Sequence, residues 1–511
     1  MHRAFYPGLF TAIAFAAFAG AQDPATHDNA ALHALLLSEN AADRLQGLQS
    51  AGPHLLKDAT CMEQVITLVD DTDPAVRLEA VRQLGFVWLD RRPAPLARAC
   101  RRDGAQPEFQ AAILAAAKEV AKPLLHELLQ HQDLYGPPEH AILLKTLSQY
   151  CGASEGANLS YIKGAFAALP DHASEQRKLL ATGFLAGAVD AGRWEFIRRL
   201  ADSRSLPEGL LAQLIEEART SASSNSASVD DRVHAIGLLS LDSFEQSGQR
   251  LAGLVSQKEP LRIQSVALRA LSKMGDPRMV ALIFERWPSM GPAIRQQFMF
   301  DDIRRQQYLL AMLDAIEAGR IDAETLRPWG LQEMQQHADI LIRSRMDRVL
   351  PPRDPEIAAS INTSFQTLSQ LAPAIENGKK LYQENCALCH RFDGGGFQVG
   401  PDLDVKAQSG AFTIVKKLLY PNTDALTFLY SYKVETSDFE QFAGVIVAEE
   451  DDAIVVRIPG GQDTRIPREN IDLVECTEKT LMPEGWTATL GEQGMADVVE
   501  YLVQTIQNTK K

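Results

Sequence analysis

Cys386-Ala387-Leu388-Cys389-His390 places two cysteines three positions apart and a histidine directly after the second cysteine. This is the C-x-x-C-H spacing of covalent c-type haem attachment. In that chemistry each thiol is joined to one vinyl group at the haem edge, and the histidine becomes the proximal iron ligand. The stretch therefore predicts one covalent haem c on Cys386 and Cys389, with His390 bound to the iron.

Two other interpretations of the cysteine pair compete with haem attachment. A zinc knuckle needs a second pair of ligands, and the only cysteine downstream is Cys476. A thioredoxin-type redox pair belongs to a βαβ setting, whereas this pair follows a predicted helix. The residues around the pair favour haem over both.

The segment before the cysteines predicts a helix that ends at the haem. Gly378, Tyr382 and Cys386 are spaced by four positions, so they share one helix face. Gly378 leaves room for a second helix to cross closely, and the amphipathic segment 495–502 is the candidate partner. This pairing of a first and a last helix resembles the class I cytochrome c fold.

Two motifs follow the cysteines. Gly394-Gly395-Gly396 is a loop that can lie close to a porphyrin, and Gly400-Pro401-Asp402-Leu403 resembles the Gly-Pro-x-Leu of cytochromes c. That resemblance implies that Pro401 and Leu403 belong to the haem site, with the Pro401 carbonyl on the Nδ1–H of the haem histidine. An ordinary surface turn is the alternative, and the order of the motifs disfavours it.

The sixth iron ligand is expected to be a methionine or absent. Met482 lies in Leu481-Met482-Pro483, the Met-Pro pattern expected before the last helix. Met495 lies inside that helix on an apolar face, where packing explains it better. We therefore expect His390 and Met482 as the metal ligands. A thioether ligand raises the reduction potential, which suits an electron carrier, and closes the iron to other ligands.

The stretch between His390 and Met482 is longer than a minimal cytochrome c needs. It contains β-branched runs such as 444–447 and 453–458, separated by the acidic residues 449–452. We predict a small antiparallel β insertion at about 430–474, arranged as a meander or a barrel-like sheet.

Almost all of the chain from about 29 to 348 has a helical pattern. In Asp73-Pro74-Ala75-Val76-Arg77, the aspartate can cap a helix whose first turn carries the proline. Weaker versions start at 231, 259 and 291, which is 28 and 32 positions apart. The pattern resembles HEAT-type repeats and implies an α-solenoid over 22–348. An irregular helical domain is the alternative, because the repeats between 100 and 220 are poorly formed.

Both ends of the helical region carry boundary signals. Residues 1–21 have the parts of a secretory signal, with cleavage expected near Ala21, which predicts a periplasmic protein. Three prolines within 351–355 predict a linker over 349–373, followed by a haem domain over 374–511. The predicted fold class is thus mainly α, a helical-repeat domain followed by a cytochrome c-like domain with a β insertion.

Composition restricts the partners. The formal net charge of -15 argues against nucleic acid or anionic lipid as the main partner. No segment after the signal reaches membrane length, so no membrane span is expected in the mature chain. The four cysteines outside the haem motif permit disulfides in an oxidising compartment or stay as buried thiols, and the sequence does not choose between these states: Cys61, Cys100, Cys151 and Cys476.

The region from Gly378 to about Leu502 resembles the haem-binding C-terminal domain of planctomycete and verrucomicrobial C-x-x-C-H proteins. Besides Gly-Pro-Asp-Leu, the resemblance includes Tyr-Pro-Asn at 420–422, Arg-Ile-Pro at 465–467 and Leu-Met-Pro-Glu-Gly at 481–485. In that family a helical-repeat segment often precedes the haem domain, and a propeller resembling sugar dehydrogenases precedes both. The propeller is expected to be absent here, which weakens any expectation of intrinsic dehydrogenase activity.

These observations predict a periplasmic monohaem electron carrier that docks a redox partner, for which a propeller-type dehydrogenase is the candidate, through its helical repeats. No catalytic residues are predicted, and whether the chain is an enzyme is left open. One alternative is a haem oxidoreductase subunit with an open iron, which requires that Met482 is not a ligand. Another is a helical-repeat scaffold with an accessory haem domain.

Overall fold

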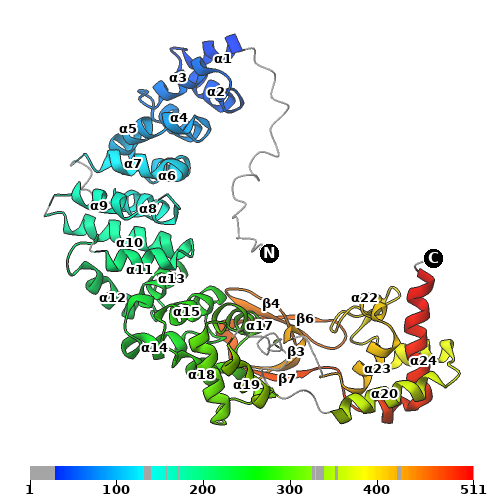
Figure 1. Cartoon of the computed structure of the whole chain (residues 1–511). Coiled ribbons are helices and arrows are strands. Elements are labelled where there is room, and N and C mark those ends of the chain that lie inside the picture. Colours follow the sequence, from blue (N-terminus) through cyan, green and yellow to red (C-terminus); the bar gives the residue numbers. More distant parts are fainter. Residues whose placement is uncertain are drawn as a thin grey trace. The chain divides into compact units, whose positions relative to one another are not determined.

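The computed structural model describes residues 29–131, 140–156, 158–170, 172–203, 205–324, 329, 339–350, 355–422 and 427–509. The predicted signal segment 1–21 lies outside these ranges. The described chain is mainly α-helical, with antiparallel strands within 391–396 and 430–480, which confirms the predicted fold class (Figure 1). It divides into an N-terminal unit, residues 1–212, and a C-terminal unit, residues 213–511.

The N-terminal unit is a succession of short helices that pack on one another in chain order. One row is formed by contacts of α2 with α4, α4 with α6, α6 with α8 and α8 with α10, and α5 packs on α7 in a second row (Figure 1). The helices of this unit are α1 (Asn29–Leu36), α2 (Ala41–Ala51), α3 (Ala59–Leu68), α4 (Pro74–Gln83), α5 (Pro93–Asp103), α6 (Pro107–Ala117), α7 (Ala121–Leu128), α8 (His140–Ala153), α9 (Leu159–Ala167), α10 (Ser174–Asp190) and α11 (Trp194–Asp202).

Arginine–aspartate pairs join consecutive helix pairs of this unit. Arg44 binds Asp71 through two hydrogen bonds of 2.7 and 2.8 Å. Arg77, 33 positions later, binds Asp103 in the same way at 2.9 and 2.8 Å. Both arginines also donate Nη1 to two backbone carbonyls of the loop that precedes their own helix. The same set of contacts thus recurs once, 33 positions apart for the arginines and 32 for the aspartates.

The helix pairing continues through the stretch where the sequence repeats are poorly formed. Helices α8 and α10 cross so closely that only glycine fits at two positions. A Cβ at Gly152 would lie 2.1 Å from the carbonyl oxygen of Phe184, and a Cβ at Gly187 would lie 1.8 Å from the carbonyl oxygen of Gln149. The glycines at this crossing thus mark the helix pair, whereas near Asp73 the pair is marked by a capping aspartate and regularly spaced apolar residues. This is why the repeats are difficult to recognise there from the sequence.

The C-terminal unit begins with further helix pairs. Helices α13 (Val229–Leu238), α15 (Leu261–Met274) and α17 (Pro292–Gln297) begin 32 and 31 positions apart, a more even spacing than the predicted starts at 231, 259 and 291. They alternate with α14 (Phe244–Gly253), α16 (Met279–Arg286) and α18 (Gln306–Glu317). Helix α12 (Leu210–Ser221) precedes this series, and α19 (Ile340–Val349) packs on α18.

The last helices surround the C-x-x-C-H segment. They are α20 (Pro355–Ser369), α21 (Ile375–Asn385), α22 (Leu403–Lys406), α23 (Ala411–Leu419) and α24 (Trp486–Thr509). Helix α20 occupies most of the stretch that the sequence analysis assigns to a linker. It packs on α23 and α24, because Phe365 and Leu368 join the apolar cluster around Val415 and Trp486.

Helices α21 and α24 cross in contact, as predicted from Gly378. A Cβ at Gly378 would lie 2.0 Å from the carbonyl oxygen of Asp497 and 3.0 Å from Cβ of Tyr501, so only glycine allows the two backbones to approach this closely. Next to the crossing, Tyr382 packs on Phe392 and Tyr501, with ring centroids 5.7 and 5.8 Å from its own. The predicted pairing of first and last helices is confirmed.

Buried Asp497 fixes this crossing through three hydrogen bonds. Its carboxylate accepts from the Ala374 amide at 2.8 Å, from Asn377 Nδ2 at 2.7 Å and from Gln493 Nε2 at 2.8 Å. Burial raises the pKa of Asp497, but these hydrogen bonds outweigh it and leave the pKa below its usual value. The carboxylate is therefore charged at neutral pH and ties the start of α21 to α24.

We expect Asp497→Ala to lower the free energy of unfolding by about 3 kcal/mol, because three donors at the crossing lose their acceptor. Urea denaturation at pH 7 measures this, with Glu492→Ala, an exposed carboxylate on the same helix, as the control. Since folding lowers the pKa, the contribution of Asp497 is complete above the unfolded pKa of about 3.9 and is lost as pH falls through the native value. A loss no larger than that of the control would contradict the expectation.

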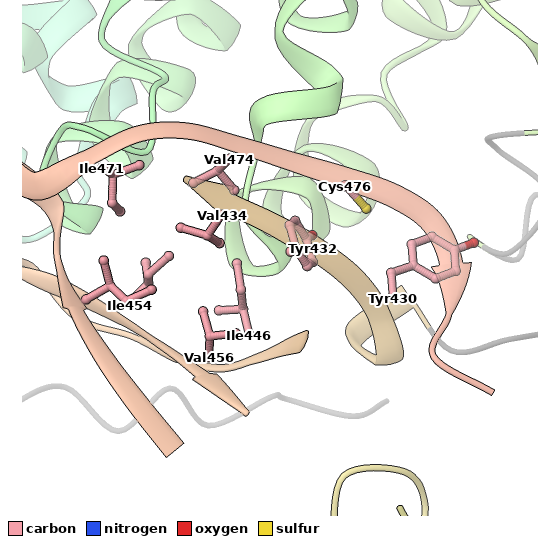
Figure 2. Packing of buried hydrophobic residues seen from close by; sticks show 10 residues of the cluster. Tyr430, Tyr432, Val434, Ile446, Ile454, Val456, Ile471, Val474 and Cys476 are labelled. Carbon is pink, nitrogen blue, oxygen red and sulfur yellow. The ribbon is translucent and has the colours of Figure 1, made fainter. Parts of the chain in front are cut away.

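The five strands after residue 429 form one antiparallel sheet in the order β6-β5-β4-β3-β7. The strands are β3 (Tyr430–Thr436), β4 (Gln441–Glu449), β5 (Ala453–Arg457), β6 (Asp463–Pro467) and β7 (Ile471–Thr480), and a two-stranded ribbon, β1 (Arg391–Phe392) and β2 (Gly395–Gly396), precedes them. Figure 2 shows Val434, Ile446 and Val456 turned toward one another in the sheet core. The sequence analysis missed β7, which returns to pair with β3.

Acidic residues at the end of β4 and in the turn that follows cap two of the preceding helices. Asp451 accepts a hydrogen bond from the Arg262 amide in the first turn of α15, at 2.9 Å. Glu449 accepts one from the Ala293 amide in the first turn of α17, at 2.8 Å. The residues that precede these two helices provide no capping side chain of their own. Such caps stabilise a helix by about 1 kcal/mol each, so the sheet stabilises the repeats on which it packs.

A second contact between the sheet and the repeats is buried. The Arg468 guanidinium, after β6, donates to the backbone oxygen of Gln257 at 2.9 Å and to its side-chain oxygen at 2.7 Å. It also donates to the Glu450 carbonyl at 2.9 Å. Burial lowers the pKa of Arg468, which nonetheless keeps its charge. The sheet is therefore held to the loop before α15 as well as to the helix ends.

Among the described residues, no helix combines the length and the apolar character needed to cross a membrane.

Candidate functional site

The C-x-x-C-H segment is one tight turn at the end of α21. The amide of Cys386 donates to the Tyr382 carbonyl at 2.8 Å, and the amides of Cys389 and His390 donate to the Cys386 carbonyl at 3.0 and 2.9 Å. The Tyr382 hydroxyl donates to the His390 carbonyl at 2.7 Å. These bonds thus fix the backbone that carries both thiols and the imidazole.

The residues after β2 fold back on this turn. The Phe397 amide donates to the Ala387 carbonyl at 2.9 Å, and the amides of Val399 and Gly400 donate to the Cys389 carbonyl at 2.9 and 2.8 Å. These bonds place 397–400 beside the histidine. A Cβ at Gly400 would lie 2.6 Å from Cε1 of His390, so position 400 has no space for a side chain while the imidazole stays in place.

The structure defines the tautomer of His390. Its Nδ1 lies 2.8 Å from the carbonyl oxygen of Pro401, the contact that the Gly-Pro-x-Leu resemblance implies. A carbonyl oxygen only accepts, so Nδ1 carries the proton and Nε2 keeps its lone pair. Burial lowers the pKa of His390, and the hydrogen bond to Pro401 raises it to a smaller extent. The imidazole is therefore neutral at pH 7, the form in which it binds a metal.

The two thiols do not resemble a redox-active pair. Burial and the neighbouring Cys389 raise the pKa of Cys386 to about 11, and burial raises that of Cys389. Redox pairs of the thioredoxin type act through a lowered thiol pKa. The structure thus disfavours the dithiol interpretation.

A zinc knuckle is disfavoured as well. Cys476 packs in the core of the five-stranded sheet with Tyr432, whereas Cys386 packs with Tyr382 and Phe392. In the part of the chain that the structure describes, no group of three or more His, Cys, Asp or Glu side chains is arranged to hold a metal ion. Four cysteines, Cys61, Cys100, Cys151 and Cys476, are buried free thiols.

Leu403 and Met482 lie in two neighbouring apolar clusters. Leu403 packs in the cluster that holds Cys386, and Met482 packs in the cluster that holds Met495. Ile414 and Leu490 belong to both clusters, so the apolar region is continuous from the cysteine turn to the segment before α24. Met495 is only 1% exposed, which agrees with the packing role expected for it.

The residues at the turn fit a haem. They offer a neutral imidazole with a free Nε2 and two thiols on one turn. Apolar side chains on this turn and after it are exposed, namely Leu388, Phe397 and Val405. A haem joined to the thiols would be in a position to cover apolar surface of this kind, and that burial is favourable. Cys386, Cys389, His390 and Pro401 are thus brought together by hydrogen bonds, with Leu403 beside them.

Sequence reasoning missed other residues that shape the turn. Arg391 pairs with Asp402, and this hydrogen bond lowers the pKa of Asp402. Gly400 lies so near the imidazole that a side chain there would clash with it. Gly400 and Asp402 lie inside the Gly-Pro-Asp-Leu motif and Arg391 directly follows His390, and these positions were the signal that could have identified them. Arg457, which donates to the backbone next to Phe397, carries no such signal, because 59 positions separate it from Gln398.

Comparison with protein families matches residues 375–422 to the family model described as Cytochrome c. The matched segment spans α21, the C-x-x-C-H turn, the Gly-Pro-Asp-Leu motif and α23. It ends before the first strand of the five-stranded sheet. A search of curated proteins finds no match to the chain.

Proposed function

We propose that this protein, whose C-terminal region contains a cytochrome c-like haem-binding domain, carries electrons through one haem c. The observation that carries the proposal is the hydrogen bond from His390 Nδ1 to the Pro401 carbonyl, on the same turn as Cys386 and Cys389. It leaves Nε2 free for iron and fixes the orientation of the ring.

The residues have distinct roles in this proposal. Cys386 and Cys389 hold the haem covalently, and His390 and Met482 are its iron ligands. Pro401 orients the imidazole and makes it more basic. When bound, the haem supplies one-electron chemistry between ferrous and ferric iron. As an iron ligand, the Met482 thioether would favour the ferrous state and leave no room for a bound substrate, which suits electron transfer rather than catalysis.

The remaining parts of the chain have proposed roles as well. We assign 22–348 to HEAT-like repeats that dock a redox partner, such as a propeller-type dehydrogenase, and 374–511 to the haem domain. Residues 349–373 are proposed as the connection, in which α20 already packs on α23 and α24. Export through the signal segment 1–21 to the periplasm agrees with haem attachment outside the cytoplasm. As part of the same proposal, we assign the haem domain to the planctomycete and verrucomicrobial C-x-x-C-H proteins.

The test of this function is carbon monoxide binding to the ferrous protein. We expect the wild type not to bind carbon monoxide and Met482→Leu to bind one equivalent, with a more negative reduction potential, because leucine keeps the volume but cannot bind iron. Met495→Leu is the matched control, since Met495 packs in the same cluster. Stoichiometric binding by the wild type would mean an open iron and would favour the oxidoreductase alternative.

A further inference from the structure

The turn between β5 and β6 touches the haem-attachment segment directly. The Gly460 amide donates to the carbonyl of Leu388, inside the C-x-x-C-H motif, at 2.9 Å. A Cβ at Gly461 would lie 2.7 Å from Phe397. Both glycines have positive φ values, 94° and 76°, which a tight turn of this kind requires. The hairpin therefore contacts both the C-x-x-C-H turn and the loop that returns to the histidine.

Arg457 adds a third contact at the end of β5. Its Nη1 donates to the Gln398 carbonyl at 2.9 Å. Its Nε and Nη2 bind the carboxylate of Asp463, its cross-strand partner on β6, at 2.6 and 2.8 Å. The two-point pair with Asp463 holds the guanidinium plane, so the remaining donor is aimed at the loop.

At the end of the sheet away from Arg457, acidic residues bind the helices α15 and α17. Glu449, the last residue of β4, caps α17, and Asp451, in the turn that follows, caps α15. Antiparallel ladders connect β4 to β5, with a register shift between Ile446 and Ala448, and β5 to β6 without one. The strand β5 thus runs from the capping turn to Arg457. Because core strands open less readily than loops do, β5 is a stable link between the two anchored ends.

We propose that the five-stranded sheet positions the haem-attachment segment relative to the repeats of the C-terminal unit, and that Arg457 is its positioning residue. The inference rests on the proposed haem attachment for its redox consequences. Arg457 acts through the Gln398 carbonyl and the hydrogen-bonded stretch 397–400, whose last residue, Gly400, lies beside His390.

The physical consequence concerns water at the haem edge. Without the Arg457 donor, the Gln398 carbonyl is free to turn to solvent, and the amides of Phe397 and Val399 open more often. Greater access of water favours the more highly charged ferric state, so the reduction potential falls. Arg457→Lys keeps the positive charge and an N–H group for the Gln398 carbonyl, but it loses the two-point pair with Asp463. Its effect on the reduction potential is therefore smaller than that of Arg457→Ala.

Two readouts test the proposal in the full chain, and one of them needs no haem. We expect Arg457→Ala to speed hydrogen exchange of the 397–400 amides at least threefold. It should also lower the ferrous-to-ferric ratio at a fixed potential about threefold, with Arg457→Lys in between. Arg465→Ala is the control. Arg465 lies on β6 and binds the acidic turn through Glu450 and Asp452. It should match the wild type in both readouts.

The outcomes separate this inference from the proposed function. The covalent haem content of each variant is measured first, by mass spectrometry of the denatured protein. A wild type without haem overturns the proposed function, while the exchange readout still decides whether Arg457 holds the loop. A haem-loaded Arg457→Ala with wild-type exchange and potential overturns the inference alone. Equal shifts in Arg457→Ala and Arg465→Ala also overturn it, because the effect would then be one of charge.

Discussion

The double variant Cys386→Ser, Cys389→Ser is expected to contain no covalently bound haem. A serine hydroxyl does not form the thioether that joins a cysteine to a haem vinyl group, and the variant keeps His390 and Pro401 in place. Haem staining after denaturing electrophoresis should therefore fall below one per cent of the wild type, roughly a hundredfold loss, since bond formation needs the thiols. Circular dichroism should still show the helical content of the repeats.

Cys476→Ser is the control for this loss. Cys476 is a buried cysteine of the same C-terminal unit, but it lies in the core of the five-stranded sheet. The serine there weakens packing, so stability falls, while covalent haem stays. Wild-type haem staining in the double cysteine variant would contradict the assignment of the attachment site.

The second large effect is expected from Gly400→Ala. The new Cβ would lie 2.6 Å from His390 Cε1 and 3.1 Å from Nδ1, so the ring must move and its hydrogen bond to Pro401 is broken or lengthened. We expect at least a tenfold loss of correctly ligated haem protein and a loss of stability of about 1–3 kcal/mol from overpacking. The optical spectrum of the purified ferric protein measures the first effect, and urea denaturation measures the second.

Gly395→Ala controls for a substitution in the same loop. A Cβ there would have only the Phe392 carbonyl oxygen within 4 Å, at 3.8 Å, which is ordinary contact. The spectrum of this variant should be that of the wild type. If Gly400→Ala also gave a wild-type spectrum, the contact between Gly400 and the imidazole would not hold His390 in its ligating position.

Local motifs are the part of this molecule that the sequence predicts well. The C-x-x-C-H turn and the Gly-Pro-Asp-Leu motif lie within twenty residues, so the distances between their side chains depend mostly on short-range geometry. The contact at Gly378 was also predictable, because a glycine on the same helix face as Tyr382 and Cys386 has a clear steric role. The helix α20 was missed because the prolines before it indicated a linker, whereas apolar Phe365 and Leu368 decide its packing.

Long-range contacts are the part that the sequence does not reveal. The acidic residues 449–452 separate two predicted strands and give no sign of a distant partner, yet Asp451 caps a helix that begins 190 positions earlier. Strand β7 was missed because its buried residues, Ile471, Val474 and Cys476, are not evenly spaced. Register shifts in its pairing with β3 break the alternation that would identify a strand. The arginine–aspartate pairs of the N-terminal unit were likewise invisible without the fold.

The most direct test of the account is the near-infrared absorption of the ferric wild-type protein at neutral pH. The account predicts a weak charge-transfer band of sulfur bound to low-spin ferric haem, which requires both a haem on the Cys386–Cys389 turn and the Met482 thioether on its iron. A high-spin ferric spectrum without this band would contradict the closed iron and the carrier function. A protein without haem absorbance would contradict the site itself.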